Sequence, residues 1–258
     1  MYNSHSSSKS PKSSTNTRHF VNAGVLVAIS TVVLNWLLNW ALPLPRQAST
    51  QSIIVDRFFG YHVLLIAFLF SLVVVFMLYA LVVFRRREGD DGEGEHFEGN
   101  TTLEIFWTVA PMAFVIIFAY LGITTLNEIT RPQENEAVVQ VEGFQWGWTF
   151  TYPDGVVTDE LVLQNNVPVK LELRSKDVLH SFWVPEFRVK QDLVPGEQNM
   201  KEIRFTPSLE GDYKLRCAEL CGLSHYSMVK NVRVVSATAY QEWHSQELAK
   251  ISPALAKK

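Results

Sequence analysis

The sequence predicts a membrane-anchored all-β protein, in which a transmembrane helical hairpin precedes a domain of short strands. The chain has 258 residues, is 47% hydrophobic and carries a formal net charge of -3. It is therefore too apolar for one soluble domain and too polar for a protein that lies wholly in a membrane. Two long uncharged stretches occupy residues 61–84 and 105–126, and short alternating runs follow from residue 131 onward.

The N-terminal region divides into a polar tail and an apolar stretch. Residues 1–19 are rich in Ser, Thr, Asn and Lys, so we expect a disordered tail. Residues 20–45 contain no charged residue and follow Lys9, Lys12 and Arg18. This stretch is either a signal peptide or an additional transmembrane helix. Retention is favoured because the apolar region of a signal usually has only about 7 to 15 residues.

Residues 55–130 are predicted to form the transmembrane helical hairpin. At about 1.5 Å per residue, the stretch 61–84 can cross a hydrocarbon core about 30 Å thick. The basic run 85–87 follows at once, and positive residues beside a span mark the cytoplasmic side. Residues 88–100 are acidic and rich in glycine, so we expect a cytoplasmic loop. The second span then places everything after residue 127 outside, whether residues 20–45 are cleaved or kept.

Residues 131–236 have the pattern of a β-domain. Alternating runs lie at residues 137–141, 167–173, 201–205 and 229–235. Turn signals separate them at residues 153–155, 165–166, 195–196 and 210–211. Several short strands with regular punctuation predict an antiparallel sandwich or barrel. Residues 237–258 are expected to form a C-terminal helix, from 237 to 249, that packs against this domain and ends in a tail.

One loop of the β-domain collects metal-binding side chains. Cys217, Cys221, His225 and Met228 can converge on one point, and His180 is the best candidate for a further strong ligand. Sulfur and imidazole ligands favour copper, zinc or iron, and a thioether indicates copper. A disulfide between the two cysteines would leave the neighbouring His and Met unexplained.

The pattern Cys-x-Glu-x-Cys-x-x-x-His-x-x-Met, preceded by His-Ser-Phe-Trp-Val-Pro, resembles subunit II of haem-copper cytochrome c oxidases. The resemblance covers most of residues 55–245. It implies a cupredoxin-like Greek-key β-barrel that holds the binuclear copper centre CuA, with both cysteines bridging two copper ions. The implied copper ligands are His180, Cys217, the backbone carbonyl of Glu219, Cys221, His225 and Met228. The Glu219 carboxylate would face a magnesium site shared with subunit I.

The resemblance also assigns roles to two residues outside the loop. Residues 143–152 carry aromatic side chains at period two, which predicts a strand with one face inward and one outward. By resemblance, Trp146 is the surface residue at which electrons from cytochrome c or a similar soluble carrier arrive. Between residues 132 and 169 there are six acids and no Lys or Arg, which would steer a basic carrier. Glu104 would lie at the cytoplasmic mouth of a proton channel, whereas its position alone indicates only a favourable helix dipole.

The resemblance therefore implies an electron-transfer subunit of a respiratory oxidase, in the plasma membrane of a bacterium. Its partners would be subunit I, other oxidase subunits, the soluble carrier and the lipid bilayer, while dioxygen reduction belongs to subunit I. Three alternatives are a quinol oxidase subunit, a membrane-tethered zinc module and a copper-binding assembly protein. Quinol oxidase subunits lack the two cysteines, and a zinc site would leave Met228 without a purpose. The charge balance offers no basic surface for nucleic acid.

Overall fold

The computed structural model describes residues 13–89, 96 and 98–255, and it divides the chain into two compact units. One unit comprises Met1–Leu44 and Phe59–Ile105, and the other comprises Pro45–Phe58 and Phe106–Lys258. The tail expected at residues 1–12, most of the expected cytoplasmic loop at 90–95 and 97, and residues 256–258 lie outside the described residues.

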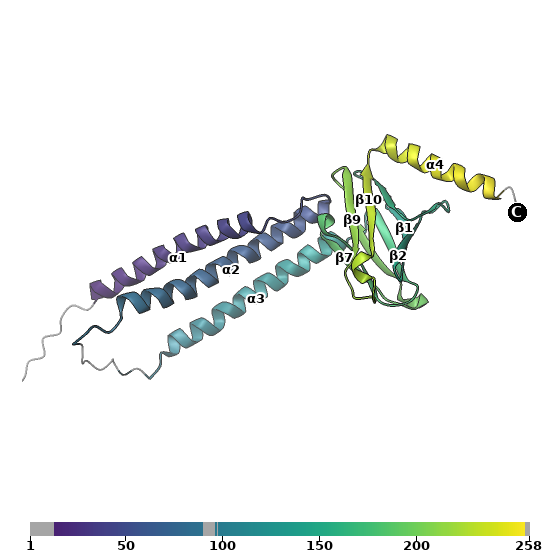
Figure 1. Ribbon diagram of the computed structural model, residues 1–258. Coiled ribbons are helices and arrows are strands. Elements are labelled where there is room, and N and C mark those ends of the chain that lie inside the picture. Colours follow the sequence, from purple (N-terminus) through teal and green to yellow (C-terminus); the bar gives the residue numbers. More distant parts are fainter. Residues whose placement is uncertain (1–12, 90–95, 97, 256–258) are drawn as a thin grey trace, which may run out of the picture. The chain divides into compact units, whose positions relative to one another are not determined.

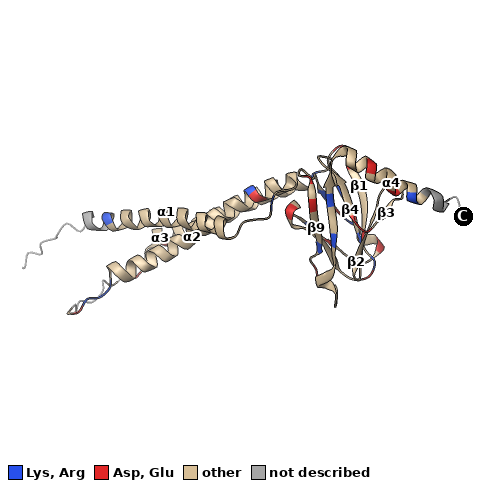
Figure 2. Cartoon of the chain, turned by 45° about the horizontal axis from the view of Figure 1, so that its top comes forward, with Lys and Arg blue, Asp and Glu red and all other residues tan. Residues whose placement is uncertain are grey.

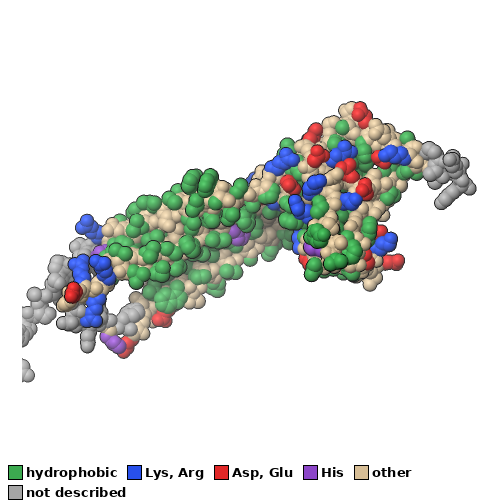
Figure 3. All heavy atoms as spheres, in the orientation of Figure 1, with side chains coloured by type: hydrophobic (Ala, Val, Ile, Leu, Met, Phe, Trp, Pro, Cys, Tyr) green, Lys and Arg blue, Asp and Glu red, His purple; other side chains and the backbone are tan. Residues whose placement is uncertain are grey.

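Three long helices precede the strands in the described part of the chain: α1 Ser13–Ala41, α2 Thr50–Val83 and α3 Thr101–Thr130 (Figure 1). All three are long and apolar enough to cross a membrane, the first over Thr17–Ala41. Hydrophobic side chains cover most of their visible surface (Figure 3), and Figure 2 shows long stretches of each helix without a charged residue. This is the composition expected of helices whose solvent is hydrocarbon.

The helix bounds differ from the predicted ones at their starts. Helix α1 begins at Ser13, inside the segment whose composition predicted disorder. A helix nucleated in the following apolar stretch can extend backwards at little cost, because each added residue closes one more hydrogen bond. Helix α3 begins ahead of its apolar stretch because Asn100 caps it, with its Oδ1 accepting from the N–H of Leu103 at 3.1 Å.

The β-domain consists of two five-stranded sheets, ordered β3-β2-β1-β5-β8 and β4-β10-β9-β6-β7. The strands are β1 Ala137–Phe144, β2 Gly147–Thr151, β3 Val157–Thr158, β4 Leu161–Gln164, β5 Val169–Ser175, β6 His180–Val184, β7 Val189–Leu193, β8 Lys201–Phe205, β9 Gly211–Cys217 and β10 Val229–Val235. Single 3-10 turns lie at Pro185–Phe187, Glu197–Asn199 and His225–Ser227. Buried side chains from both sheets, among them Phe150, Leu171 and Leu215, form one core between the layers.

The predicted sandwich is confirmed, but its sheets are not wholly antiparallel. Strand β1 pairs in parallel with β5, and β4 pairs in parallel with β10. Parallel neighbours need a crossover connection. Here β2 to β4 lie between β1 and β5 in the sequence, and β5 to β9 lie between β4 and β10. Alternation of side chains is the same in parallel and antiparallel strands, so the sequence pattern could not distinguish them. The arrangement is consistent with the cupredoxin-like fold that the resemblance implied.

The start of α2 belongs to the same unit as the β-domain and is built into it. Ala48, Ser49 and Ser52 are fully buried, and Ser49 forms a β-bridge with Pro207. The Ser49 hydroxyl donates to the carbonyl of Phe187 at 2.8 Å. These polar contacts explain why α2 begins at Thr50, well before the uncharged stretch that predicted it.

An ion pair completes this attachment. Asp56 of α2 accepts from Arg188, at 2.7 Å from Nε and 3.1 Å from Nη2, and the two side chains are only 12% and 11% exposed. We expect Arg188→Met to lower the free energy of unfolding of the β-domain by about 3 kcal/mol, because the buried Asp56 carboxylate loses its charged partner and keeps only the hydrogen bond from Gln47. The change can be measured by thermal unfolding of the full chain in detergent. Adding Asp56→Asn to Arg188→Met should restore part of the loss, and a double variant no more stable than Arg188→Met would contradict this account.

The C-terminal helix α4 Ala237–Leu255 packs on the β-domain, as predicted, and it extends beyond residue 249. The rings of Trp243 and Tyr152 lie 5.2 Å apart, and His244 contacts Asp154 at 2.6 Å. The buried Tyr152 hydroxyl both donates to and accepts from the backbone of Val162, each at 2.9 Å. Burial raises the pKa of Tyr152, so this phenol stays protonated and keeps both hydrogen bonds.

Candidate metal centre

Two neighbouring strands and one loop bring the predicted metal ligands together. His180 is the first residue of β6, and Cys217 is the last residue of β9, which pairs with β6. The loop after Cys217 returns to β10, and the Cys217 N–H donates to the carbonyl of Met228 at 3.2 Å. The loop ends are therefore closed by the antiparallel β9–β10 pair, so the side chains between them are confined to one site.

All six predicted donor groups converge there. The sulfur atoms of Cys217 and Cys221 lie 3.8 Å apart. The Nδ1 of His180 lies 3.9 Å from the Cys217 sulfur, and the Nδ1 of His225 lies 3.5 Å from the Cys221 sulfur. The Met228 sulfur is 3.7 Å from that of Cys221, and the Glu219 carbonyl is 3.3 Å from that of Cys217. Each thiol thus has its own imidazole and one weaker donor.

The site is largely shielded from water. His180, Met228 and Cys221 are 0%, 1% and 3% exposed, whereas Cys217 and His225 are half-buried. Both cysteines are free thiols, so the disulfide considered above is not present. Burial, and then the neighbouring Cys217, raise the pKa of the Cys221 thiol to about 11. A metal cation offsets both effects, so metal binding here should be accompanied by release of thiol protons.

Asp177 orients one imidazole. Its Oδ1 lies 2.8 Å from the Nε2 of His180, which leaves the Nδ1 of His180 facing the Cys217 sulfur. Burial acts to raise the pKa of the Asp177 carboxyl, but hydrogen bonds from His180 and from two backbone N–H groups outweigh it and lower the pKa. A carboxylate in this position fixes the tautomer and the ring orientation of a metal-binding histidine. The sequence analysis missed Asp177, although its place three residues before His180 was a usable signal.

The donor set fits a pair of copper ions. Thiolate, imidazole and thioether are the ligands that select copper. His180 and the Glu219 carbonyl lie beside Cys217, while His225 and Met228 lie beside Cys221. A single ion could be held by His180, Cys217 and Cys221, whose donor atoms lie within 4.8 Å of one another. Only two ions would use all six donors.

Trp146 lies at the metal site, but it is not part of a strand, although the aromatic pattern of residues 143–152 predicted one. All aromatic residues from 144 to 152 have the same parity, and Trp148, Phe150 and Tyr152 are buried. Continuous alternation would have buried Trp146 with them. Instead Gln145 and Trp146 form the tight turn between β1 and β2, which leaves the Trp146 side chain 41% exposed. The prediction of one continuous strand was therefore wrong, because a two-residue turn interrupts it.

Most of the six acids of residues 132–169 have a basic partner elsewhere in the β-domain. Three of them are in ion pairs with Lys or Arg: Glu136 with Arg204, Asp159 with Lys230 and Glu160 with Arg233. The fourth, Asp154, lies 2.6 Å from His244 Nε2. The Lys230 ammonium lowers the pKa of the Asp159 carboxyl through a hydrogen bond and its charge. A paired acid contributes less net field than a free one, and steering of a basic carrier by this run stays a prediction.

Two further groups that the resemblance assigned, the Glu219 carboxylate and Glu104, are not among the six donors. The Glu219 carboxylate forms an ion pair with Lys190 at 3.1 Å, with both side chains partly exposed. Glu104 lies in the first turn of α3, in the other unit, with an exposed side chain.

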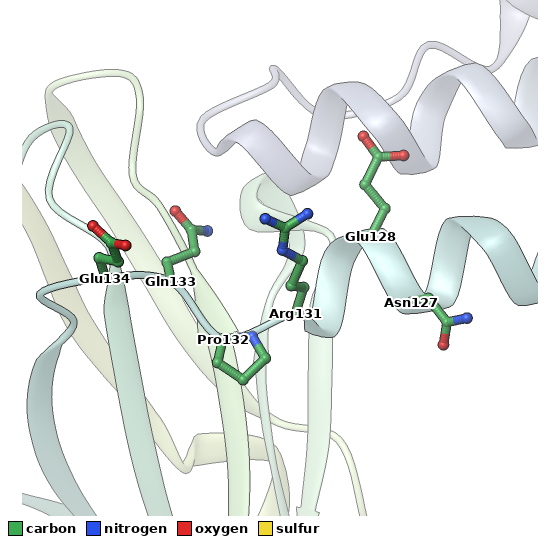
Figure 4. A pocket seen from close by; sticks show the side chains of 6 residues that line it. All are labelled: Asn127, Glu128, Arg131, Pro132, Gln133 and Glu134. Atoms are coloured by element: carbon green, nitrogen blue, oxygen red, sulfur yellow. The ribbon is translucent and has the colours of Figure 1, made fainter.

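A separate hollow of about 640 Å³ at the end of α3 is lined by Asn127, Glu128, Arg131, Pro132, Gln133 and Glu134 (Figure 4). It contains no sulfur or imidazole, so it is not a further site for a soft metal.

Known proteins resemble this chain in both of its parts. Residues 35–125 match the transmembrane domain of cytochrome c oxidase subunit II, and residues 155–235 match its periplasmic domain. A cytochrome c oxidase subunit 2 from Thermostichus vulcanus is 33% identical over 89% of this chain and 85% of its own length. One from Synechocystis is 31% identical over 84% and 79%. The crystal structure of the periplasmic domain of subunit II from Bradyrhizobium japonicum has 27% identity and a TM-score of 0.43, covering 46% of this chain and 97% of that one.

Proposed function

Because the chain belongs to the cytochrome c oxidase subunit II family, we propose that its six converging donors hold the binuclear copper centre CuA. The chain is the electron-transfer subunit of a haem-copper oxidase. In the proposed reaction, electrons from cytochrome c or another soluble carrier arrive at the β-domain and leave toward subunit I. Dioxygen is reduced in subunit I, so this chain makes and breaks no bond of the substrate.

The proposed ligands divide into bridging and terminal groups. Cys217 and Cys221 would bridge the two ions, and His180 and His225 would each bind one of them. The Met228 thioether and the Glu219 carbonyl would complete the set. When bound, a copper pair bridged by two thiolates can accept and release one electron. The chain itself keeps water away from the buried donors and, through Asp177, holds the tautomer of His180.

The observation that carries this proposal is the place of Met228. Its side chain is 1% exposed, and its sulfur lies 3.7 Å from that of Cys221. A structural zinc site would be complete with two thiolates and two imidazoles in a tetrahedral arrangement. It would give the thioether no role, whereas copper commonly takes a weak methionine ligand. The two cysteines likewise argue against a quinol oxidase subunit.

We further propose the location and the remaining partners. The chain is a membrane protein with three helices, in its described part, that can span a bilayer. Bacterial relatives support the plasma membrane, and the match to a periplasmic domain supports an extracytoplasmic β-domain. Subunit I and other oxidase subunits would surround the helices. The Glu219 carboxylate would contribute to a magnesium site shared with subunit I, and Glu104 would lie at the mouth of a proton channel.

Metal analysis combined with electron paramagnetic resonance on the full-length chain, loaded with copper in detergent, tests the proposal. We expect two copper ions per chain and one unpaired electron shared between them. One tightly bound zinc ion in preference to copper would favour the tethered zinc module. A single copper ion with an ordinary mononuclear spectrum would favour the assembly protein. Either result would overturn the assignment of CuA.

A further inference from the structure

The turn formed by Gln145 and Trp146 contacts both chain segments that carry the metal donors. On one side, the backbone N–H of Gln145 donates to Asp177 Oδ2 at 2.7 Å, while Oδ1 of the same carboxylate lies 2.8 Å from His180 Nε2. On the other side, the Gln145 side-chain amide donates to the carbonyl of Cys221 at 2.7 Å. The Trp146 indole N–H donates to that carbonyl at 3.3 Å. A carbonyl oxygen has two lone pairs, so it can accept both bonds.

The turn and the loop fit closely. Gly222 has a φ of +119°, and a Cβ built on it would lie 3.0 Å from Gln145 Nε2 and 3.3 Å from the Trp146 ring. Gly143, just before the turn, is equally confined, since a Cβ there would lie 3.3 Å from Cδ2 of His180. Glycine at these two positions lets the turn approach the donor loop and His180 without a steric clash.

We propose that Gln145 is a positioning residue, which ties the segment of His180 to the segment of Cys221 and thereby fixes the distance between their donor atoms. This inference rests on the proposed copper centre and adds a residue to it. His180 comes from β6 and Cys221 from the loop after β9. The pairing of β6 with β9 and the hydrogen bond from the Ala218 N–H to the Ser181 carbonyl, at 3.1 Å, hold only the start of this loop. Gln145 adds a second link farther along the loop, at Cys221, through one backbone and one side-chain hydrogen bond. Both of its partners are next to, or part of, a metal ligand.

The side-chain bond is the part that substitution can remove. Gln145→Leu keeps the backbone N–H that binds Asp177 but has no donor for the Cys221 carbonyl. Gln145→Asn keeps an amide that is one methylene group too short to reach it. Both variants leave the longer bond from Trp146 as the remaining donor to the carbonyl. The loop around Cys221 should then open more often, while the two sheets stay folded.

The first test uses the full-length chain without metal, so that it does not depend on copper. The rate at which a maleimide labels Cys221 is followed by peptide mass spectrometry. Cys221 is 3% exposed, so labelling requires the loop to open. We expect labelling about tenfold faster in Gln145→Leu and Gln145→Asn, the factor expected for one lost hydrogen bond. Gln140→Leu, an exposed position on the same strand β1, is the matched control and should label like the wild type.

The second test measures the spectrum and the reduction potential of the copper-loaded site. We expect Gln145→Leu to bind the same number of copper ions as the wild type but to show a changed copper hyperfine pattern and a shifted reduction potential. A role limited to packing would leave both unchanged. Gly222→Ala should change them in the same direction by displacing the turn. Gly155→Ala is its control, because Gly155 also has a positive φ, of +86°, but has no atom within 4 Å of a Cβ.

Equal labelling rates in the wild type, Gln145→Leu and Gln145→Asn would overturn the positioning role. So would a spectrum and potential that are unchanged in Gln145→Leu. If the wild-type chain binds zinc or one copper ion, the copper proposal fails, but the labelling rates still decide whether Gln145 links the two segments. The two failures are therefore distinguishable.

Discussion

Cys217→Ser is expected to abolish the signal of two coppers sharing one electron and to leave at most one copper ion per chain. The Cys217 sulfur lies 3.8 Å from that of Cys221 and near both His180 Nδ1 and the Glu219 carbonyl. A serine hydroxyl stays protonated at neutral pH and is a poor ligand for a soft ion, so it cannot bridge. Copper analysis and electron paramagnetic resonance of the purified full-length variant measure the loss.

A serine placed elsewhere in the same loop provides the control. Leu223 is 86% exposed and contributes no donor, so Leu223→Ser should bind two copper ions and give the wild-type spectrum. Cys221→Ser should behave like Cys217→Ser, because its sulfur lies next to His225 and Met228. A normal two-copper spectrum in either cysteine variant is incompatible with bridging by both thiolates.

The parts of the fold that depend on local sequence pattern were predictable. Uninterrupted apolar length predicted the cores of α2 and α3, and alternation predicted β8 and β10 at the residues where they are found. The start of α2 was not predictable in this way. It is fixed by Ser49 and by the pairing of Asp56 with Arg188, which lies 132 positions further along the chain. A hydropathy pattern contains no information about such partners.

The candidate site also has parts that depend on local sequence and parts that depend on partners far away in the chain. Cys217, Cys221, His225 and Met228 lie in one loop, so their spacing was enough to group them. Position 145 stood out only in the structure, because Gln145 reaches Asp177 and Cys221 across 32 and 76 positions. The acidic run shows the converse, because closeness in sequence did not reveal the partners of its members. Its members are close in sequence, but β-strand connections carry four of them to basic partners on other elements.

Trp146 connects the exposed surface of the β-domain to the donor loop through one side chain. Its ring is 41% exposed, while its N–H donates to the carbonyl of Cys221. An exposed tryptophan is also the side chain most often found to dominate a protein interface. Trp146 therefore joins the expected docking surface directly to the loop that holds the thiols.

We expect Trp146→Ala to lower the second-order rate of electron transfer from cytochrome c about 30-fold, which corresponds to the loss of about 2 kcal/mol at an interface hot spot. Copper content should not change, because Trp146 supplies no ligand and Gln145 still binds the Cys221 carbonyl. Stopped-flow kinetics of the assembled oxidase at several ionic strengths measure the rate. The slope of the rate against salt should be the same as in the wild type, since the substitution removes no charge.

Two further variants separate the possible causes of this loss. Trp146→Phe keeps an aromatic face but has no N–H. A rate close to that of the wild type would assign the effect to docking. A rate close to that of Trp146→Ala would assign it to the hydrogen bond with the Cys221 carbonyl. Val157→Ala is the control, because Val157 is 58% exposed and pairs with the far end of β2. If Trp146→Ala transfers electrons as fast as Val157→Ala at low ionic strength, Trp146 is only a packing residue of the turn, and the carrier must dock elsewhere on the β-domain.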